Sequence, residues 1–178
     1  LYLKFMTVQI NYKKSLSKKS AGNIVLFVDE KFSISGIKKY ISNSEFSFIS
    51  DLLRTKDTKK QILNFDISSK KKVILVSLKS TSTNSDVEKI GAKFYDIFKD
   101  FKPFEYNLNT DSTPLKLKKL VGHFLHGLKL KSYTFEKYKN KKSNLKINIF
   151  VSGNNKPSLK EQIKFNAIEE GTFYARDL

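Results

Sequence analysis

The stretch KVILVSLKSTSTNSDVEKIGAKFYDIF, residues 72–98, joins a continuous apolar run to a helical pattern and so decides the fold class. The run at 72–78 is typical of a strand that is buried on both faces of a sheet. Ser85 and Glu88 have the S-x-x-E spacing of a capping box, which predicts the start of a helix there. The side chains that this helix would turn toward the core are Val87, Ile90, Phe94, Ile97, Phe98 and Phe101.

The sequence on either side extends this unit into a larger sheet. An apolar run at 104–108 follows the helix, and strand, helix and strand in this order predict two parallel strands joined by a crossover. Pro114, after Thr113, is suited to the first turn of another helix. We therefore expect an α/β fold whose mixed, mostly parallel sheet has helices on both faces. Further strands are predicted at residues 5–12, 23–28, 61–67 and 145–151, and helices at 33–53 and 113–130.

The last stretch, SLKEQIKFNAIEEGTFYARDL at 158–178, predicts a helix with a clear start. Ser158 and Glu161 form a second capping box. No Gly, Asn or Pro stop signal precedes Leu178, so we expect this helix to lead into a further domain. The chain then divides into a sheet domain at 1–155 and a linker helix at 156–178. The predicted apolar face, which we expect to pack partly on the further domain, consists of Ile163, Ala167, Ile168, Gly171, Tyr174, Ala175 and Leu178.

A net charge of +17 raises the possibility of nucleic-acid binding. Arg54 and Arg176 are the only arginines, however, and the lysines are spread over every segment. Because base-edge and bidentate phosphate contacts favour Arg, we interpret the charge as a solvated surface and a biased composition. The best nucleic-acid candidate is the lysine-rich segment 137–142, with aromatic neighbours at Tyr133, Phe135 and Tyr138.

The absence of Cys excludes disulfides and thiolate metal sites. The apolar N-terminus is interrupted by Lys4 and Gln9, so it predicts a strand rather than a signal peptide. No run reaches the roughly 20 apolar residues that a membrane span needs. We expect a cytoplasmic protein with no membrane partner.

Residues suited to chemistry are few. No two glycines have a phosphate-loop spacing. His123 and His126 share a helix face, but two imidazoles fall short of a zinc site, so we interpret them as packed or hydrogen-bonded. The acidic pairs at 29–30 and 169–170 have no evident partner acid or base and are interpreted as solvated charge. The prediction is therefore that the chain holds no catalytic, cofactor-binding or metal-ligating residue.

Three segments resemble one known family. KVILVSLKSTSTNSDVEKIGAKFYDIFKD at 72–100 is similar to a strand, loop and helix of the form R-V-L-L-V-G-L-G. VGHFLHGLKLKSYTFEKYKNKK at 121–142 resembles E-G-x-x-L-G-x-Y-x-F-x-x-Y-K-x-K, and IEEGTFYARDL at 168–178 resembles G-x-x-x-A-R-D-L. In this order the segments resemble the N-terminal domain of the cytosol (leucyl) aminopeptidase family. Residues 1–60 match it only in coarse layout.

The resemblance implies a two-domain, hexameric metallo-exopeptidase that releases N-terminal residues from peptides. Its two divalent metal ions (zinc, manganese or magnesium), its ligands and its catalytic residues would lie in a C-terminal domain beyond this chain. The present chain would be a macro-domain-like three-layer sandwich that acts in assembly, active-site access or partner binding. Ser77 and Lys79 replace the glycines of G-L-G, which argues against an ADP-ribose-type pocket. A basic nucleic-acid-binding module is the alternative function.

Overall fold

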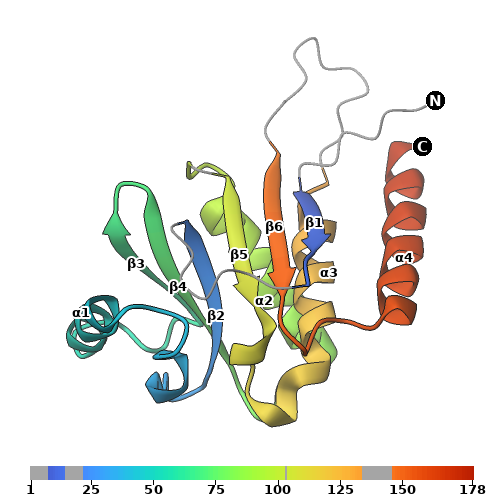
Figure 1. Ribbon diagram of the computed structural model, residues 1–178. Helices are drawn as coiled ribbons and strands as arrows, with labels where there is room; N and C mark the ends of the chain where they lie inside the picture. The colour runs from blue at the N-terminus through green and yellow to red at the C-terminus, as the bar shows by residue number, and fades with distance from the viewer. Residues whose placement is uncertain (1–7, 15–21, 103, 134–145) are drawn as a thin grey trace.

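The computed structural model describes residues 8–14, 22–102, 104–133 and 146–178, which form a six-stranded sheet with helices on both faces (Figure 1). The strand order is β1-β6-β5-β2-β4-β3. Neighbouring strands are parallel except for β3, which pairs antiparallel with β4. The predicted mixed, mostly parallel sheet is therefore confirmed. The strands are β1 Val8–Tyr12, β2 Asn23–Asp29, β3 Ile62–Ser68, β4 Lys71–Leu78, β5 Glu105–Asn109 and β6 Ile147–Ser152.

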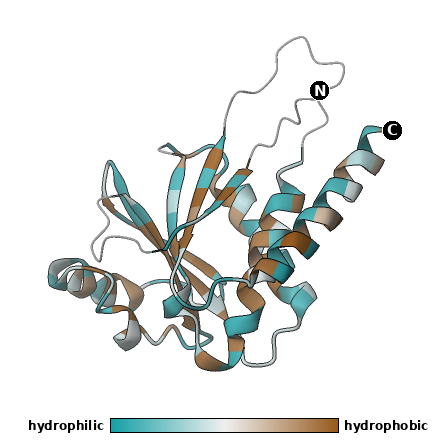
Figure 2. Ribbon diagram, turned by 45° about the vertical axis from the view of Figure 1, so that its right-hand side comes forward, coloured by the Kyte–Doolittle hydropathy of each residue, from teal (hydrophilic) through white to brown (hydrophobic). Residues whose placement is uncertain are grey.

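The sheet separates two apolar cores, so that apolar residues are concentrated in its strands (Figure 2). In β4, Ile74 and Val76 join one core, while Val73 and Leu75 join the other. This alternation explains why the strand has a continuous apolar run, as expected for a strand buried on both faces. The core that contains Ile74 and Val76 is covered by α2 (Asn84–Phe98) and α3 (Val121–Lys131). The core that contains Val73 and Leu75 is covered by η1 (Ser35–Ile37) and α1 (Asn43–Leu53).

Helix α2 starts two residues earlier than the sequence predicts. Its N-cap is Thr83, whose hydroxyl accepts a hydrogen bond from the amide of Asp86, and the Asp86 carboxylate accepts one from the Thr83 amide. The predicted Ser85–Glu88 capping box is therefore wrong, because Asp at the third position caps as well as Glu. Within the predicted stripe, Ile97 and Phe101 are exposed, whereas the other four side chains are buried.

The backbones of α2 and α3 touch through two glycines. A Cβ atom on Gly91 would lie 2.0 Å from the carbonyl oxygen of Phe124, and one on Gly127 would lie 2.0 Å from that of Glu88. Neither position can hold a side chain unless the helices separate. The close approach lets Phe94 and Phe124 meet edge to face with ring centroids 5.6 Å apart.

The predicted helix at 113–130 is two elements. These two elements are a 3-10 helix, η3 (Leu115–Leu120), and the α-helix α3, which begins only at Val121. Another short 3-10 helix, η2 (Thr110–Ser112), precedes them and directly follows β5. Pro114 is the N-cap of η3, with φ −53° and ψ 137°, and so lies just before the first helical residue rather than within the first turn. The last helix, α4 (Leu159–Asp177), lies along the outside of α3 and ends near the upper edge of the molecule (Figure 1).

Candidate interaction surface on the C-terminal helix

Helix α4 begins as predicted. The Ser158 hydroxyl accepts a hydrogen bond from the amide of Glu161, and the Glu161 carboxylate accepts one from the Ser158 amide at 2.8 Å. Hydrogen bonds from Ser158 hold the pKa of the Glu161 carboxyl below its usual range. The second capping box of the sequence is thus confirmed.

The face of α4 that meets α3 was not predicted. The Phe165 ring lies 4.8 Å from the His126 ring and 5.1 Å from the His123 ring, measured between centroids. It covers Gly122, where a Cβ atom would come within 2.7 Å of the Phe165 ring. Two turns along, Phe173 is buried as well. Phe165, Glu169 and Phe173 follow one another at four-residue steps and so share one face.

Glu169 is the centre of a buried polar network between α3 and α4. Its Oε1 is hydrogen-bonded to Nδ1 of His126 at 2.8 Å, and its Oε2 lies 2.7 Å from Nζ of Lys129. Lys129 also donates to Oδ1 of Asn166 at 3.1 Å. The side chains of Glu169, His126 and Lys129 are only 3%, 6% and 10% exposed. A buried carboxylate is tolerated only when it is paired, so this network favours one rotational setting of α4.

These contacts test two interpretations made from the sequence, one of the two histidines and one of Glu169. The histidines are packed and hydrogen-bonded, as interpreted: His123 bonds Glu88 of α2 at 2.7 Å, while His126 bonds Glu169 of α4. The interpretation of Glu169 as solvated and without a partner is wrong, although Glu170 beside it is exposed. A buried Glu in an otherwise apolar stripe breaks the pattern by which a core-facing side is recognised.

Near its last turn, α4 is clamped to the end of α3. The Tyr133 ring stacks on Phe173 with centroids 5.3 Å apart, and its hydroxyl donates to Oδ1 of Asp177 at 2.6 Å. The guanidinium of Arg176 donates to the carbonyl oxygen of Leu130 at 3.2 Å, which satisfies a carbonyl in the last turn of α3. Loss of solvent around the phenol, and then its bond to Asp177, raise the pKa of Tyr133 to about 12. Arg176 and Asp177 of the A-R-D-L segment thus make structural contacts within this chain.

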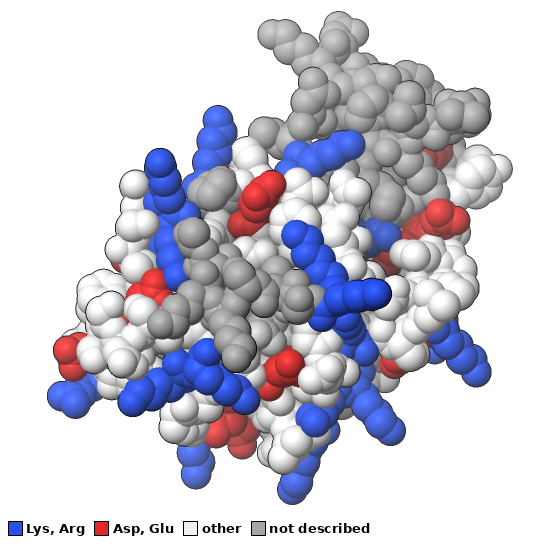
Figure 3. Space-filling model, viewed as in Figure 1, with Lys and Arg blue, Asp and Glu red and all other residues white. Residues whose placement is uncertain are grey.

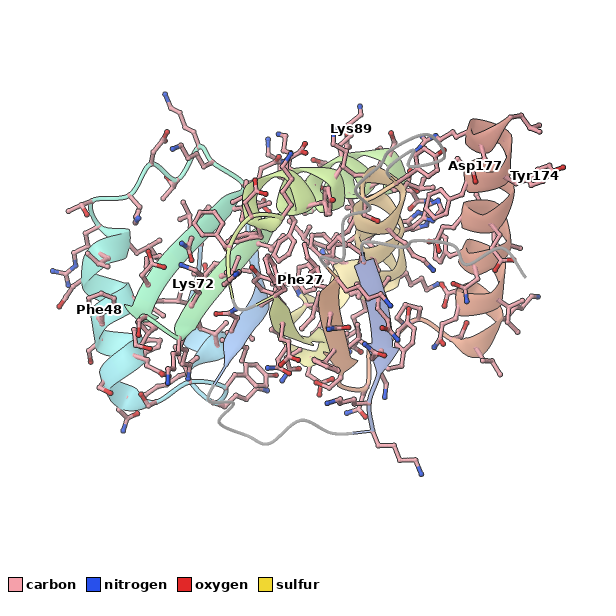
Figure 4. All side chains as sticks on the ribbon, turned by 90° about the horizontal axis from the view of Figure 1, so that it is seen from above. Phe27, Phe48, Lys72, Lys89, Tyr174 and Asp177 are labelled. Atoms are coloured by element: carbon pink, nitrogen blue, oxygen red, sulfur yellow. The ribbon has the colours of Figure 1, made fainter. Side chains whose placement is uncertain are left out.

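The opposite side of α4 is apolar and faces outward. Leu159, Ile163, Tyr174 and Leu178 are 71%, 61%, 66% and 91% exposed. Nothing lies within 4 Å of a Cβ atom built on Gly171, and Tyr174 points away from the rest of the molecule (Figure 4). The apolar face predicted from the sequence is therefore present, but the described part of the chain leaves it open to solvent. Such a concentration of exposed apolar side chains is typical of an interaction surface.

The acidic pair at the end of β2, Asp29 and Glu30, accepts hydrogen bonds from backbone amides. Oδ1 of Asp29 accepts hydrogen bonds from the amides of Lys31 and Ser33 at 3.0 and 2.9 Å. Burial opposes ionisation, but these bonds hold the pKa of Asp29 below its usual range. The Glu30 carboxylate accepts a bond from the amide of Ser80, in the loop after β4, at 3.2 Å. The Ser80 amide, which could otherwise bind an anion at this loop, therefore already donates to the carboxylate of Glu30.

The loops after β5 and β6 are likewise bonded to one another. Thr110 donates to the carbonyl oxygen of Ser152 at 2.7 Å, and the amide of Asn154 donates to Oδ1 of Asp111 at 2.7 Å. Gly153 has φ +100°, and a Cβ there would lie 2.5 Å from Oγ1 of Thr110. These polar groups stabilise the edge of the sheet where α/β proteins often bind ligands. They hold the two loops together.

Positive charge is spread over the face seen in Figure 3, with acidic side chains among the lysines. The lysine-rich segment 137–142 lies outside the described residues. Within the described ranges, no group of three His, Asp or Glu side chains is placed to hold a metal ion. No helix in those ranges is both long and apolar enough to cross a membrane.

Known proteins resemble this chain in structure rather than in sequence. No family model and no curated protein matches it. A mutant tomato leucine aminopeptidase matches 92% of this chain with a TM-score of 0.65 and 15% identity. The bottromycin maturation enzyme BotP, solved in complex with Mn, matches 89% with a TM-score of 0.59 and 14% identity. The chain spans only 36% and 32% of those two chains, so what it shares with a leucine aminopeptidase is the fold of about one third of that enzyme.

Proposed function

We propose that this chain is the N-terminal, non-catalytic domain of a leucyl-aminopeptidase-like exopeptidase, which removes N-terminal residues from peptides. The observation that carries the proposal is the match of 92% of this chain to 36% of a leucine aminopeptidase. The resemblance of residues 121–142 and 168–178 to segments of the same family is a second, independent support.

In this proposal peptide hydrolysis belongs to a separate domain with two divalent metal ions, zinc, manganese or magnesium. Several of the side chains suited to chemistry already make structural bonds: His126 to Glu169, His123 to Glu88 and Asp29 to backbone amides. The present domain then serves assembly, active-site access or partner binding in a cytoplasmic homo-hexamer.

Helix α4 is the connection in this proposal, within a linker at residues 156–178. The clamp formed by Tyr133, Arg176 and Asp177 fixes the direction in which the helix leaves the domain. A catalytic domain attached to α4 would therefore have a defined orientation rather than a flexible tether.

Activity measurements on two proteins test the proposal: residues 1–178, and the complete product of the gene that encodes them. With Mn²⁺ or Zn²⁺ added, the complete product should hydrolyse leucine p-nitroanilide, and a chelator should abolish the reaction. The 178-residue chain should show no turnover. Metal-dependent turnover that co-purifies with the short chain, or a complete product without such activity, would overturn the proposal.

Nucleic-acid binding is the second candidate, motivated by the net charge of +17. Fluorescence anisotropy with labelled single- and double-stranded DNA distinguishes it. A binding module should lose about 10³-fold or more in affinity between 50 and 200 mM salt. The absence of binding at 50 mM salt would exclude this function.

A further inference from the structure

We propose that the free edge of β3 binds an extended acidic peptide, which adds a strand to the six-stranded sheet. This inference does not rest on the proposed function. The site, called here the β3 edge, consists of residues 62–66 of β3 together with Lys93, Ile97 and Phe101, which lie on α2 or just after it.

The outer side of β3 has free backbone groups, because β3 is the last strand at one end of the sheet (Figure 1). The amide of Ser77 in β4 donates to the carbonyl oxygen of Gln61, directly before β3, at 2.8 Å. Bonded residues alternate in an antiparallel pair, so the backbone groups of Ile62, Asn64 and Asp66 point away from β4. Within the described ranges, no group is hydrogen-bonded to these amides and carbonyl oxygens.

One side of α2 runs along this edge. Lys93 donates to Oε1 of Gln61 at 3.1 Å, which places it beside the start of β3. Just after the end of α2, the Phe101 ring centroid lies 5.1 Å from Nζ of Lys72, and the same ammonium is paired with Asp66 of β3. Contacts at both ends therefore hold this side of α2 against β3.

The same side of α2 carries exposed apolar groups. Ile97 lies one turn after Lys93. The Ile97 and Phe101 side chains are 42% and 46% exposed. Since Ile62 belongs to the core that α2 covers, a strand added beside β3 would direct alternate side chains toward Ile97 and Phe101. Free backbone groups and exposed apolar groups in one place are what peptides use when they extend a sheet.

Charge around the β3 edge selects an acidic partner. Residues 56–72, which include β3 and the sequence at both its ends, contain six lysines and two aspartates. Lys59, Lys60 and Lys70 are exposed, and no described acidic side chain is paired with them. Acidic residues at both ends of a bound peptide would lie near these lysines. A second copy of the chain would bring the same lysines together, which disfavours pairing of β3 with itself.

A bulge sets the length of the bound peptide. The register between β3 and β4 shifts between Asp66 and Ser68. Because a bulge bends its strand and interrupts regular pairing, an added strand would pair with residues 62–66 alone. The bound segment is therefore short.

A synthetic peptide tests the mode of binding without any change in the protein. The probe is fluorescein-labelled Glu-Glu-Val-Thr-Val-Thr-Val-Glu-Glu, which should bind with a Kd of about 100 μM or lower by fluorescence anisotropy at low salt. Only every second amide of an added strand faces β3. N-methylation of the central valine and of a neighbouring threonine should therefore differ in effect by about 10-fold or more. Equal effects, or no binding, would overturn the proposal.

Two matched variants of the protein test the site. Ile97→Glu should weaken peptide binding by about 10-fold or more, because it removes an apolar contact and adds a charge that repels the glutamates. Ile163→Glu makes the same change at an exposed position of α4, beyond the opposite end of the sheet, and should leave the Kd unchanged (Figure 1). Circular dichroism shows whether both variants fold. Equal weakening by the two would show that affinity follows net charge alone and would contradict a site at β3.

Hydrogen exchange locates the bound peptide. In the free chain the amides of Ile62, Asn64 and Asp66 should exchange rapidly although they lie in a strand, because they have no acceptor. A saturating concentration of the probe peptide should slow them by about 10-fold. The amides of β1, at the other end of the sheet, should be unchanged. Protection of β1 in place of β3 would reject the β3 edge as the site.

Discussion

The two sides of α3 are packed in different ways. Toward α2 the helix backbones touch at Gly91 and Gly127, and the rings of Phe94 and Phe124 meet edge to face. Toward α4 the contact is made by side chains: Phe165 over Gly122, and Glu169 in its polar network. The α2 side of α3 belongs to the core that packs against the sheet. On the other side, the side chains of only a few residues hold α4 against α3. We therefore expect α4 to open locally while the sheet and α2 stay folded.

The largest expected effect lies on the α2 side. Gly127→Ala places a methyl group 2.0 Å from the carbonyl oxygen of Glu88, which belongs to backbone and cannot rotate away. Overpacking commonly costs about 1–3 kcal/mol, and the rigid neighbour should raise the loss in unfolding free energy to about 4 kcal/mol. Urea denaturation measures it.

Gly171→Ala is the control for that substitution. The same methyl group meets open space on α4, and the loss of a mid-helix glycine should stabilise the protein by about 0.5–1 kcal/mol. Equal effects of the two substitutions would show that α2 and α3 are not in backbone contact.

On the α4 side, Glu169→Ala leaves His126 and Lys129 without their carboxylate. Breaking a buried pair costs about 3 kcal/mol or more, and this cost should fall on the docking of α4 rather than on the whole domain. Hydrogen exchange should accelerate in α4 and remain slow in β2 and β4. The neighbouring exposed variant Glu170→Ala should exchange like the parent; equally fast exchange in that variant would show that the loss of a negative charge from α4, rather than the buried network, is responsible.

A smaller effect is expected where α4 rests on a glycine. Gly122→Ala pushes against the Phe165 ring, a side chain that can shift, so the loss should be about 1 kcal/mol. Exchange in the first half of α4 should increase more than in its last turn. Adding Phe165→Leu should recover part of the loss, and a further loss in the double variant would contradict the contact.

These differences also mark what the sequence could predict. The run at 72–78 predicts β4 because a strand between two cores needs apolar residues on both faces. Ser158 and Glu161 predict the start of α4 because a capping box is a local interaction. Both features depend on neighbouring residues, which is why they are readable without a structure.

Contacts between distant elements were harder to predict. Gly91 and Gly127 show no phosphate-loop spacing, and their role depends on a second helix lying against each of them. The inner side of α4 was missed because Glu169 stands in its centre, and its partners are 43 and 40 residues away in α3. The periodicity therefore identified the apolar side of α4 that is open to solvent. The division at residue 155 and the linker role of α4 stay predictions.

The smallest effect expected is a dependence of the α4 clamp on pH. The pKa of Tyr133 is raised from 10.0 to about 12, so its contribution is complete below pH 10 and is lost as the pH rises through 12. Exchange in the last turn of α4 should accelerate across this range. Tyr133→Phe should remove part of the change. Because burial also raises the pKa of Tyr12 and Tyr106 to about 12, the difference between the two proteins is the informative quantity.

The buried network has a further consequence for chemical reactivity. Among the described lysines, Lys129 is the one whose side chain is buried, and α4 covers it through Glu169 and Asn166. An amine-directed reagent should acylate the surface lysines quickly and reach Lys129 only while α4 is open. Acylation there removes the positive charge that faces Glu169, so a helix caught open could not close again. The extent of acylation at Lys129 therefore measures how often α4 opens.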